Sequence, residues 1–159
     1  MLKDCHRRIE HFLDILCQVA ERAHARSLTD EERPAVQAAL RYFHTGGERH
    51  AADEEESLFP RLRVEPTAGI LEDIDRLESD HHHAADLQES VDWLYTAWIS
   101  TGMLESNEQQ QLLSQTQRLK RLYAEHIQIE KTIVFPHAAQ VLNSQVLAAM
   151  GSEFSARRK

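Results

Sequence analysis

Apolar residues recur at steps of three and four along most of this chain, which is the period of an amphipathic α-helix. The first predicted helix covers residues 2–26, and its apolar stripe contains Leu2, His6, Ile9, Leu13, Leu16 and Ala20. The second runs from about residue 29 to 63, with a stripe of Val36, Leu40, Phe43, Gly47, His50, Glu54 and Leu58. In the first stripe a histidine stands where another leucine would be expected, and in the second a histidine is joined by a glutamate.

The same period continues through the second half of the chain. The third predicted helix opens at Pro66-Thr67 and runs to about residue 100, with a stripe of Ile70, Ile74, Leu77, His81, Ala84, Gln88 and Val91. The fourth begins near Ser106, with a stripe of Leu112, Leu119, Tyr123, His126, Glu130 and Val134. Helices of similar length with short connections predict an all-α fold, an up-down-up-down antiparallel four-helix bundle. A short C-terminal helix, residues 145–150, is expected to pack on its end.

Local signals indicate where these helices start and where they are weak. Two pairs have the spacing of a capping box: Thr29 with Glu32, and Ser106 with Gln109. Gly46-Gly47 weakens the second helix and predicts a kink or a close backbone approach. Pro60 and Pro136 each remove a helical N–H group, so a kink or a helix end is expected at both.

Composition narrows the class of protein. Hydrophobic residues make up 42% of the 159 residues, and no linker divides the chain. This predicts a single domain over residues 1–159, with a core at about 2–142 and an extension at 143–159. The net charge of −8 repels phosphate backbones and disfavours nucleic acid as a partner. The basic end, 157–159, is expected to fray. No apolar stretch approaches the roughly 20 residues of a membrane span.

The two cysteines bear on the cellular compartment. Cys5 and Cys17 fall on one predicted helix, and twelve residues of helix separate them by about 18 Å, too far for a disulfide. Reduced cysteines and the lack of an apolar secretion segment at the start predict a cytoplasmic protein. Neither cysteine has the spacing of a Cys-type metal site.

One pattern occurs twice: a His, a Glu four residues later, and Phe-Pro starting five residues after the Glu. The two copies are His50…Glu54…Phe59-Pro60 and His126…Glu130…Phe135-Pro136. Helical residues four apart lie on one face, with about 5–6 Å between their Cβ atoms, so each copy presents an imidazole beside a carboxylate. In the acidic run around Glu54, Glu55 borders the apolar stripe and Glu56 is expected on the solvated face.

These side chains predict a metal centre inside the bundle. The candidate ligands are His6, His50, Glu54, His81, His126 and Glu130. Burying unpaired carboxylates costs on the order of several kcal/mol, and a cation would supply the opposite charge. A set of imidazoles and carboxylates without thiolate suits iron, manganese or zinc, and a pair of iron ions suits it best. The alternative is that protonated histidines and the glutamates satisfy one another without a metal.

At these positions the chain resembles hemerythrin-like (HHE cation-binding) domains. The match rests on His6 in His-Arg-Arg-Ile-Glu, on His81 in Glu-Ser-Asp-His, and on the two repeated strings, and it covers about residues 2–142. The resemblance implies a four-helix bundle around a non-haem di-iron centre with oxo or carboxylate bridges. It also implies that the four histidines are terminal ligands and that Glu54 and Glu130 bridge the metals.

The chain departs from the family pattern at one position. Oxygen-carrying members place a second His four residues after the first on the third helix, where this chain has Ala85. Either that coordination position stays open to water, or Glu10 or His82 fills it. Glu10 has an alternative role as the exposed partner of a nearby Lys or Arg. Among the three consecutive histidines, His81 is in phase with the apolar stripe and is preferred over His82 as a ligand.

Two functions are compatible with this site. The protein binds or senses O2 or a related small molecule such as NO or peroxide, or handles iron; alternatively, it is a di-iron enzyme of the peroxide-decomposing or ferroxidase type. The missing histidine shifts weight slightly toward the second function. A metal-free helical scaffold is the third reading. Neither a nucleophile elbow nor a Gly-rich phosphate loop occurs in the sequence, so hydrolase and nucleotide-dependent functions have no support.

Overall fold

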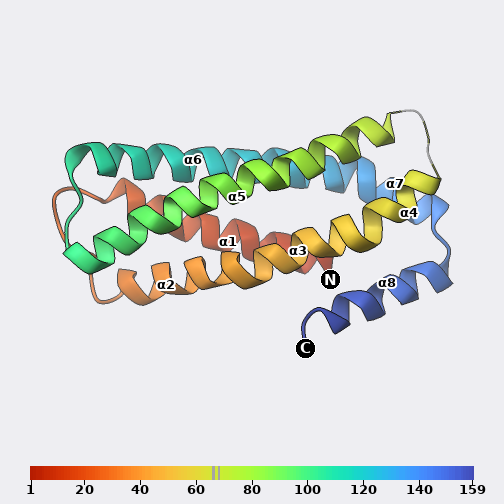
Figure 1. Ribbon diagram of the computed structural model, residues 1–159, viewed down its shortest axis with the longest axis horizontal. Helices are drawn as coiled ribbons and strands as arrows, with labels where there is room; N and C mark the ends of the chain where they lie inside the picture. The colour runs from red at the N-terminus through yellow and green to blue at the C-terminus, as the bar shows by residue number, and fades with distance from the viewer. Residues whose placement is uncertain (66, 68) are drawn as a thin grey trace.

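The computed structural model describes residues 1–65, 67 and 69–159, and these form antiparallel helical rods with one further helix (Figure 1). The first rod is α1 (Leu2–Glu21), and the third is α5 (Ile70–Thr101). The second joins α2 (Glu32–Tyr42), η1 (Phe43–Gly47), α3 (Glu48–Asp53), η2 (Glu54–Leu58) and α4 (Phe59–Val64). The fourth joins α6 (Ser106–Ile129), η3 (Glu130–Val134) and α7 (Phe135–Val141), and α8 (Ser144–Ala156) follows it. The predicted all-α four-helix bundle with a C-terminal helix is confirmed.

Several helix ends differ from those predicted. Helix α1 stops at Glu21, before residue 26; in the loop beyond it Ala25 has a φ of 46°, which is not helical, and the Trp98 indole donates to the Arg26 carbonyl at 2.8 Å. Helix α5 begins at Ile70, and Pro66, part of its predicted start, lies outside the described residues. Helix α8 extends over residues 144–156 instead of 145–150.

One of the two predicted capping boxes is present, and the other lies one residue earlier. The Thr29 N–H donates to Oε2 of Glu32 at 3.0 Å, and the Glu32 N–H donates to Oγ1 of Thr29 at 3.1 Å. At the start of α6 the reciprocal pair is Glu105 with Glu108, not Ser106 with Gln109. Carboxylates are favoured there because they accept hydrogen bonds as charged groups beside the positive end of the helix dipole.

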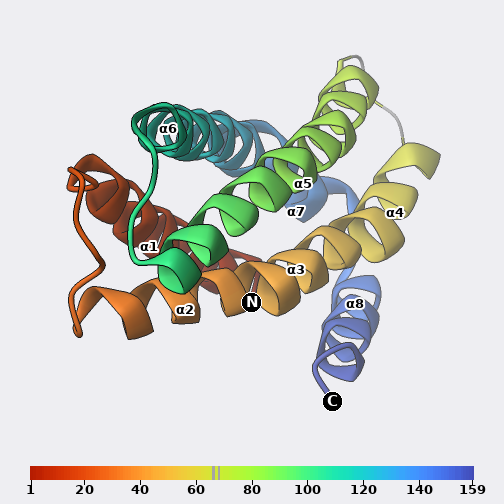
Figure 2. The same ribbon diagram turned by 60° about the vertical axis from the view of Figure 1, so that its left-hand side comes forward.

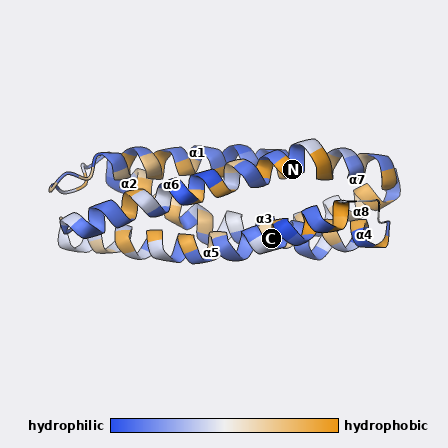
Figure 3. Ribbon diagram, turned by 90° about the horizontal axis from the view of Figure 1, so that it is seen from above, coloured by the Kyte–Doolittle hydropathy of each residue, from blue (hydrophilic) through white to orange (hydrophobic). Residues whose placement is uncertain are grey.

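A layer of buried polar side chains separates two apolar clusters in the core. One cluster lies toward the α1–α2 loop and includes Leu13, Leu16, Tyr95, Trp98 and Leu112. The other lies toward α4 and α7 and includes Phe59, Leu62, Ile74, Leu77 and Val134. Hydrophobic and hydrophilic residues alternate along every rod, as amphipathic packing requires (Figure 3). The polar layer contains the histidines that lie on the apolar stripes of the rods.

The glycine pair in the second rod lies in the π-helical turn η1. A Cβ atom on Gly46 would clash with the ring of Tyr42, and Gly47 is buried beside Phe43. The tight contact at Gly46 is thus with a side chain of the same rod, and among the described residues no close approach of another backbone is found at either glycine. The phenol of Tyr42 in turn donates to the Cys5 carbonyl at 3.3 Å, which ties this rod to α1.

Candidate metal centre

Each carboxylate of the repeated motif begins a π-helical turn. Glu54 opens η2 and Glu130 opens η3. The N–H of Phe59 donates to the Glu54 carbonyl, and the N–H of Phe135 donates to the Glu130 carbonyl, each across five residues. The Glu-to-Phe interval of five in the sequence is therefore the hydrogen bond of a π turn, a conformation that is common at functional sites.

The prolines that follow explain why the rods need these turns. A proline in a helix lacks an N–H donor, and its ring clashes with the carbonyl four residues earlier. The wider π turn that ends just before Pro60 and Pro136 gives each ring room. Of the kink or helix end expected at each proline, the helix end does not occur: a π turn precedes each proline, and the rods continue to Val64 and Val141.

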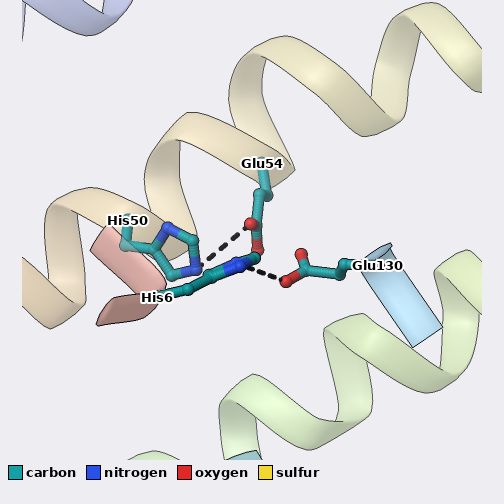
Figure 4. Close-up of side chains that lie close together, drawn as sticks. All are labelled: His6, His50, Glu54 and Glu130. Atoms are coloured by element: carbon teal, nitrogen blue, oxygen red, sulfur yellow. Dashed lines mark ion pairs between the residues drawn. The ribbon is translucent and has the colours of Figure 1, made fainter. Parts of the chain in front are cut away.

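All six candidate ligands come together in the polar layer. Two groups of them have ligand atoms within 4.8 Å of one another: His6, His50, Glu54 and Glu130 in one, and Glu54, His81 and His126 in the other. Figure 4 shows the first group, whose side chains point toward one another from α1, α3, η2 and η3. Both groups are buried, and Glu54 belongs to both.

Glu54 lies between the two groups of histidines. Its Oε1 is 3.2 Å from Nε2 of His50, and its Oε2 is 3.1 Å from Nε2 of His81. The second oxygen also lies 3.7 Å from Nε2 of His126. One carboxylate thus faces imidazoles on two sides, as a bridging ligand must.

Glu130 has the same arrangement. Its Oε2 is 2.7 Å from Nε2 of His6, and its Oε1 is 3.6 Å from Nε2 of His126. Two carboxylates from opposite rods therefore each direct one oxygen to a first His pair, His6 with His50, and one to a second His pair, His81 with His126.

None of these facing atoms makes a properly directed hydrogen bond, although all are buried. The atoms concerned are Nε2 of His6, His50, His81 and His126 and both carboxylate oxygens of Glu54 and Glu130. Leaving a buried polar atom without a partner costs about 1–3 kcal/mol, and more for a charged one. A cation between the lone pairs would satisfy them together, and nitrogen and oxygen donors without thiolate fit iron, manganese or zinc.

A carboxylate also lies near the Nδ1 atom of each histidine in the second pair. Nδ1 of His81 is 2.6 Å from Oε1 of Glu55, and Nδ1 of His126 is 3.5 Å from Oδ2 of Asp80. Such carboxylates fix the ring orientation of a ligating histidine and raise its basicity. The role of Glu55, ambiguous in the sequence, is thus assigned. Asp80 was missed, and its one signal was its place directly before His81.

The remaining candidates lie outside the cluster. Glu10 is half exposed, with Oε1 3.8 Å from Nζ of Lys131, as in the alternative considered for it. His82 and Ala85 are exposed on α5. Glu56 is exposed as expected, but it also accepts a hydrogen bond from Arg157 at 3.0 Å. Within the described residues, neither Glu10 nor His82 takes the position of the missing histidine.

Burial and charge shift the pKa values inside the layer in opposite directions. Burial lowers the pKa of His50 to about 4, against the attraction of Glu54. Burial also opposes protonation of His126, but the nearby carboxylates of Asp80, Glu130 and Glu54 outweigh it and raise its pKa to about 11. Burial and the charge of Glu54 raise the pKa of Glu130. The metal-free cluster therefore carries protons at neutral pH.

Metal binding is accordingly expected to release protons, about one per chain or more, because a ligating nitrogen must give up its proton. Since the pKa of His126 is about 11, release should persist at pH 8.5, where an ordinary histidine is already neutral. Calorimetric titration with metal in buffers of different ionisation enthalpy measures the number. Release that disappears between pH 7 and pH 8.5 would contradict the assigned protonation.

Comparison with known proteins agrees with this geometry. The family model of the hemerythrin HHE cation binding domain matches residues 1–138, a range that contains the whole buried cluster and stops before α8. No curated protein matches the chain in sequence. The family match and the buried His/Glu cluster together indicate metal binding. No helix in the described part of the chain is long and apolar enough to cross a membrane.

Proposed function

The chain belongs to the hemerythrin HHE cation-binding family, and we propose that it holds two metal ions in its polar layer. The first His pair would bind one ion, the second His pair the other, and Glu54 and Glu130 would bridge them. The main support is that each buried carboxylate directs one oxygen to the first His pair and the other to the second, and that neither oxygen is hydrogen-bonded. The whole chain is one domain in this proposal, with a core at about 2–142 and an extension at 143–159.

The donor set favours iron. Each ion would receive two imidazole nitrogens and two carboxylate oxygens, a harder set than the thiolates of structural zinc sites. Non-haem iron sites of nitrogen and oxygen ligands commonly keep open positions for small molecules. The position that Ala85 leaves without an imidazole is consistent with such an opening. Zinc and manganese accept the same donors and are outcomes of the metal analysis.

We propose that the site binds or senses O2 or a related small molecule, NO or peroxide, in the cytoplasm, where Cys5 and Cys17 would stay free thiols. When bound, the metal supplies the redox chemistry. The apolar clusters on both sides of the layer exclude water, Glu55 is hydrogen-bonded to Nδ1 of His81, and the carboxylate of Asp80 lies 3.5 Å from Nδ1 of His126. Iron handling is a related use of the same site.

One observation favours an enzyme as the second candidate. The side chain of Asp80 is 16% exposed and contacts His126, so a carboxylate links a ligand to the solvent. That link would carry protons in peroxide decomposition or in a ferroxidase-type reaction, whereas a reversible binder needs no net exchange of protons with the solvent.

Metal analysis of the purified protein tests the proposal. We expect about two iron ions per chain, the ratio of a bridged dinuclear site. The reduced protein is then exposed to O2: a stable, reversible visible band supports binding, and turnover of peroxide supports catalysis. A ratio near one would contradict the dinuclear assignment, and metal-free protein after growth and reconstitution with iron would contradict the proposal entirely.

A further inference from the structure

Helix α8 lies against the outer face of the turn that carries Glu54. Figure 2 shows it beside α3 and α4, and it follows the segment that the family model matches. We propose that α8 is a latch whose terminal arginines position the Glu54 turn from outside and so retain the metal. This inference rests on the proposed function for its effect on metal, but the contacts that carry it involve no ligand atom.

The first contact joins α8 to the residue before Glu54. The side chain of Asp53 is 0% exposed, yet its Oδ1 accepts from Arg157 at 3.1 Å and its Oδ2 from Arg158 at 2.5 Å. Neighbouring helical residues point about 100° apart, so Asp53 faces outward to α8 while Glu54 faces the metal layer. A buried carboxylate needs such cations, because removing them leaves its charge unpaired. The end of the chain, expected to fray, is therefore bound.

The second contact reaches into the π turn itself. The hydroxyl of Ser57 donates to Oε2 of Glu153 at 2.5 Å and accepts from Nη2 of Arg157 at 2.9 Å. Beyond the turn, Arg61 donates to Glu153 at 2.7 Å and to the Ser57 carbonyl at 2.8 Å. Glu153 of α8 and the two arginines that follow the helix thus contact the chain before, within and after η2.

The contacts on the two carboxylate turns are unequal. Around η3, apart from Glu130 with its histidines, the described residues form one long ion pair, 3.8 Å between Lys131 and Glu10, whose side chains are 43% and 50% exposed. Exposed pairs of this kind contribute little. If α8 is a latch, its loss should loosen the Glu54 turn and leave the Glu130 turn unchanged, a difference that general stabilisation of the fold would not produce.

The apolar side of α8 is what keeps the latch in place. Met150 and Phe154 are buried in the cluster that contains Leu58, a residue of η2. Removing the arginines therefore leaves α8 packed by its apolar contacts and by the hydrogen bonds of Glu153, and removes the contacts of the arginines with Asp53 and Ser57. The full-length chain can be tested without deleting the helix.

The test compares Arg157→Ala/Arg158→Ala with Arg118→Ala/Arg121→Ala, which removes the same charge from exposed positions on α6. Amide hydrogen exchange in the metal-free proteins reports the two turns separately. Release of ferrous iron to a coloured chelator under nitrogen reports retention. We expect faster exchange over residues 54–59 only, and iron release about 10-fold faster, the usual effect of losing support behind the ligands. Arg157→Lys/Arg158→Lys should restore most of both.

The outcomes separate the latch from the metal assignment. Unchanged exchange in both turns, or equal acceleration in both, would overturn the latch. Unchanged iron release beside faster exchange would overturn its role in retention. If the wild-type protein takes up no iron, the proposed function fails and so does retention, while exchange in the metal-free proteins still decides whether α8 holds the turn.

Discussion

Removing the metal from the wild-type protein is expected to lower its melting temperature by about 10 °C. A ligand present at a thousand times its dissociation constant stabilises the native state by about 4 kcal/mol, and each kcal/mol shifts the melting temperature of a domain of this size by about 2–4 °C. The structural source is the polar layer, where Glu54 and Glu130 are 0% exposed and lack directed hydrogen bonds. Calorimetry of iron-loaded and metal-free protein in one buffer measures the difference.

Variants with fewer ligands provide the control for this measurement. In His50→Ala and Glu130→Ala, iron content should fall and the difference between loaded and metal-free protein should shrink together, because binding and folding are linked. A chelator that lowered the melting temperature of Glu130→Ala as much as that of the wild type would be acting elsewhere. Equal melting temperatures of loaded and metal-free wild-type protein would show that these carboxylates need no cation.

The rods could be predicted from the sequence because burial depends on the helical period, and that period is visible in every stripe. A histidine in phase with apolar neighbours, as His81 is with Leu77 and Ala84, must face the interior whatever it does there. That is why four histidines from four rods reach one layer in the structure. His82, the next residue, is out of phase with the stripe and is exposed.

The π turns were not predicted, although their signal was present. The sequence shows that Phe59 lies five residues after Glu54, but a spacing does not reveal which N–H the carbonyl accepts. A kink or a helix end was the expectation at each proline, because proline removes a hydrogen bond and crowds the helix. A single wider turn satisfies both constraints, and the apolar packing of α4 beyond it supports continuation of the rod.

Contacts between residues far apart in the chain could not be predicted from the sequence, for another reason. Asp80 supports His126 from a different rod, and Arg157 reaches Asp53 across 104 residues. Neither pair has a local periodicity that could mark it, and charged residues are solvated more often than paired. Only the tertiary arrangement shows that the carboxylate of Asp53 is buried and that the arginines at the chain end are its partners.

Replacing Glu54 with Gln is expected to lower the iron content from about two ions per chain to one or none, since a neutral amide cannot bridge two cations as a carboxylate does. The matched control is Glu48→Gln, the same change six residues earlier in the same rod, where the side chain is exposed. That variant should bind as much iron as the wild type. Metal analysis after reconstitution under identical conditions compares the three proteins.

The melting temperatures of the same variants show whether Glu54 acts through the metal or through the fold. In the metal-free protein Glu54 faces imidazoles whose protonation it favours, so the neutral amide removes attraction but also removes a buried charge. We therefore expect metal-free Glu54→Gln to melt close to the metal-free wild type and to gain little from iron. A variant that bound two ions yet melted far lower would make Glu54 a structural partner of the histidines. A variant that kept both the ions and their stabilisation would remove it from the centre altogether.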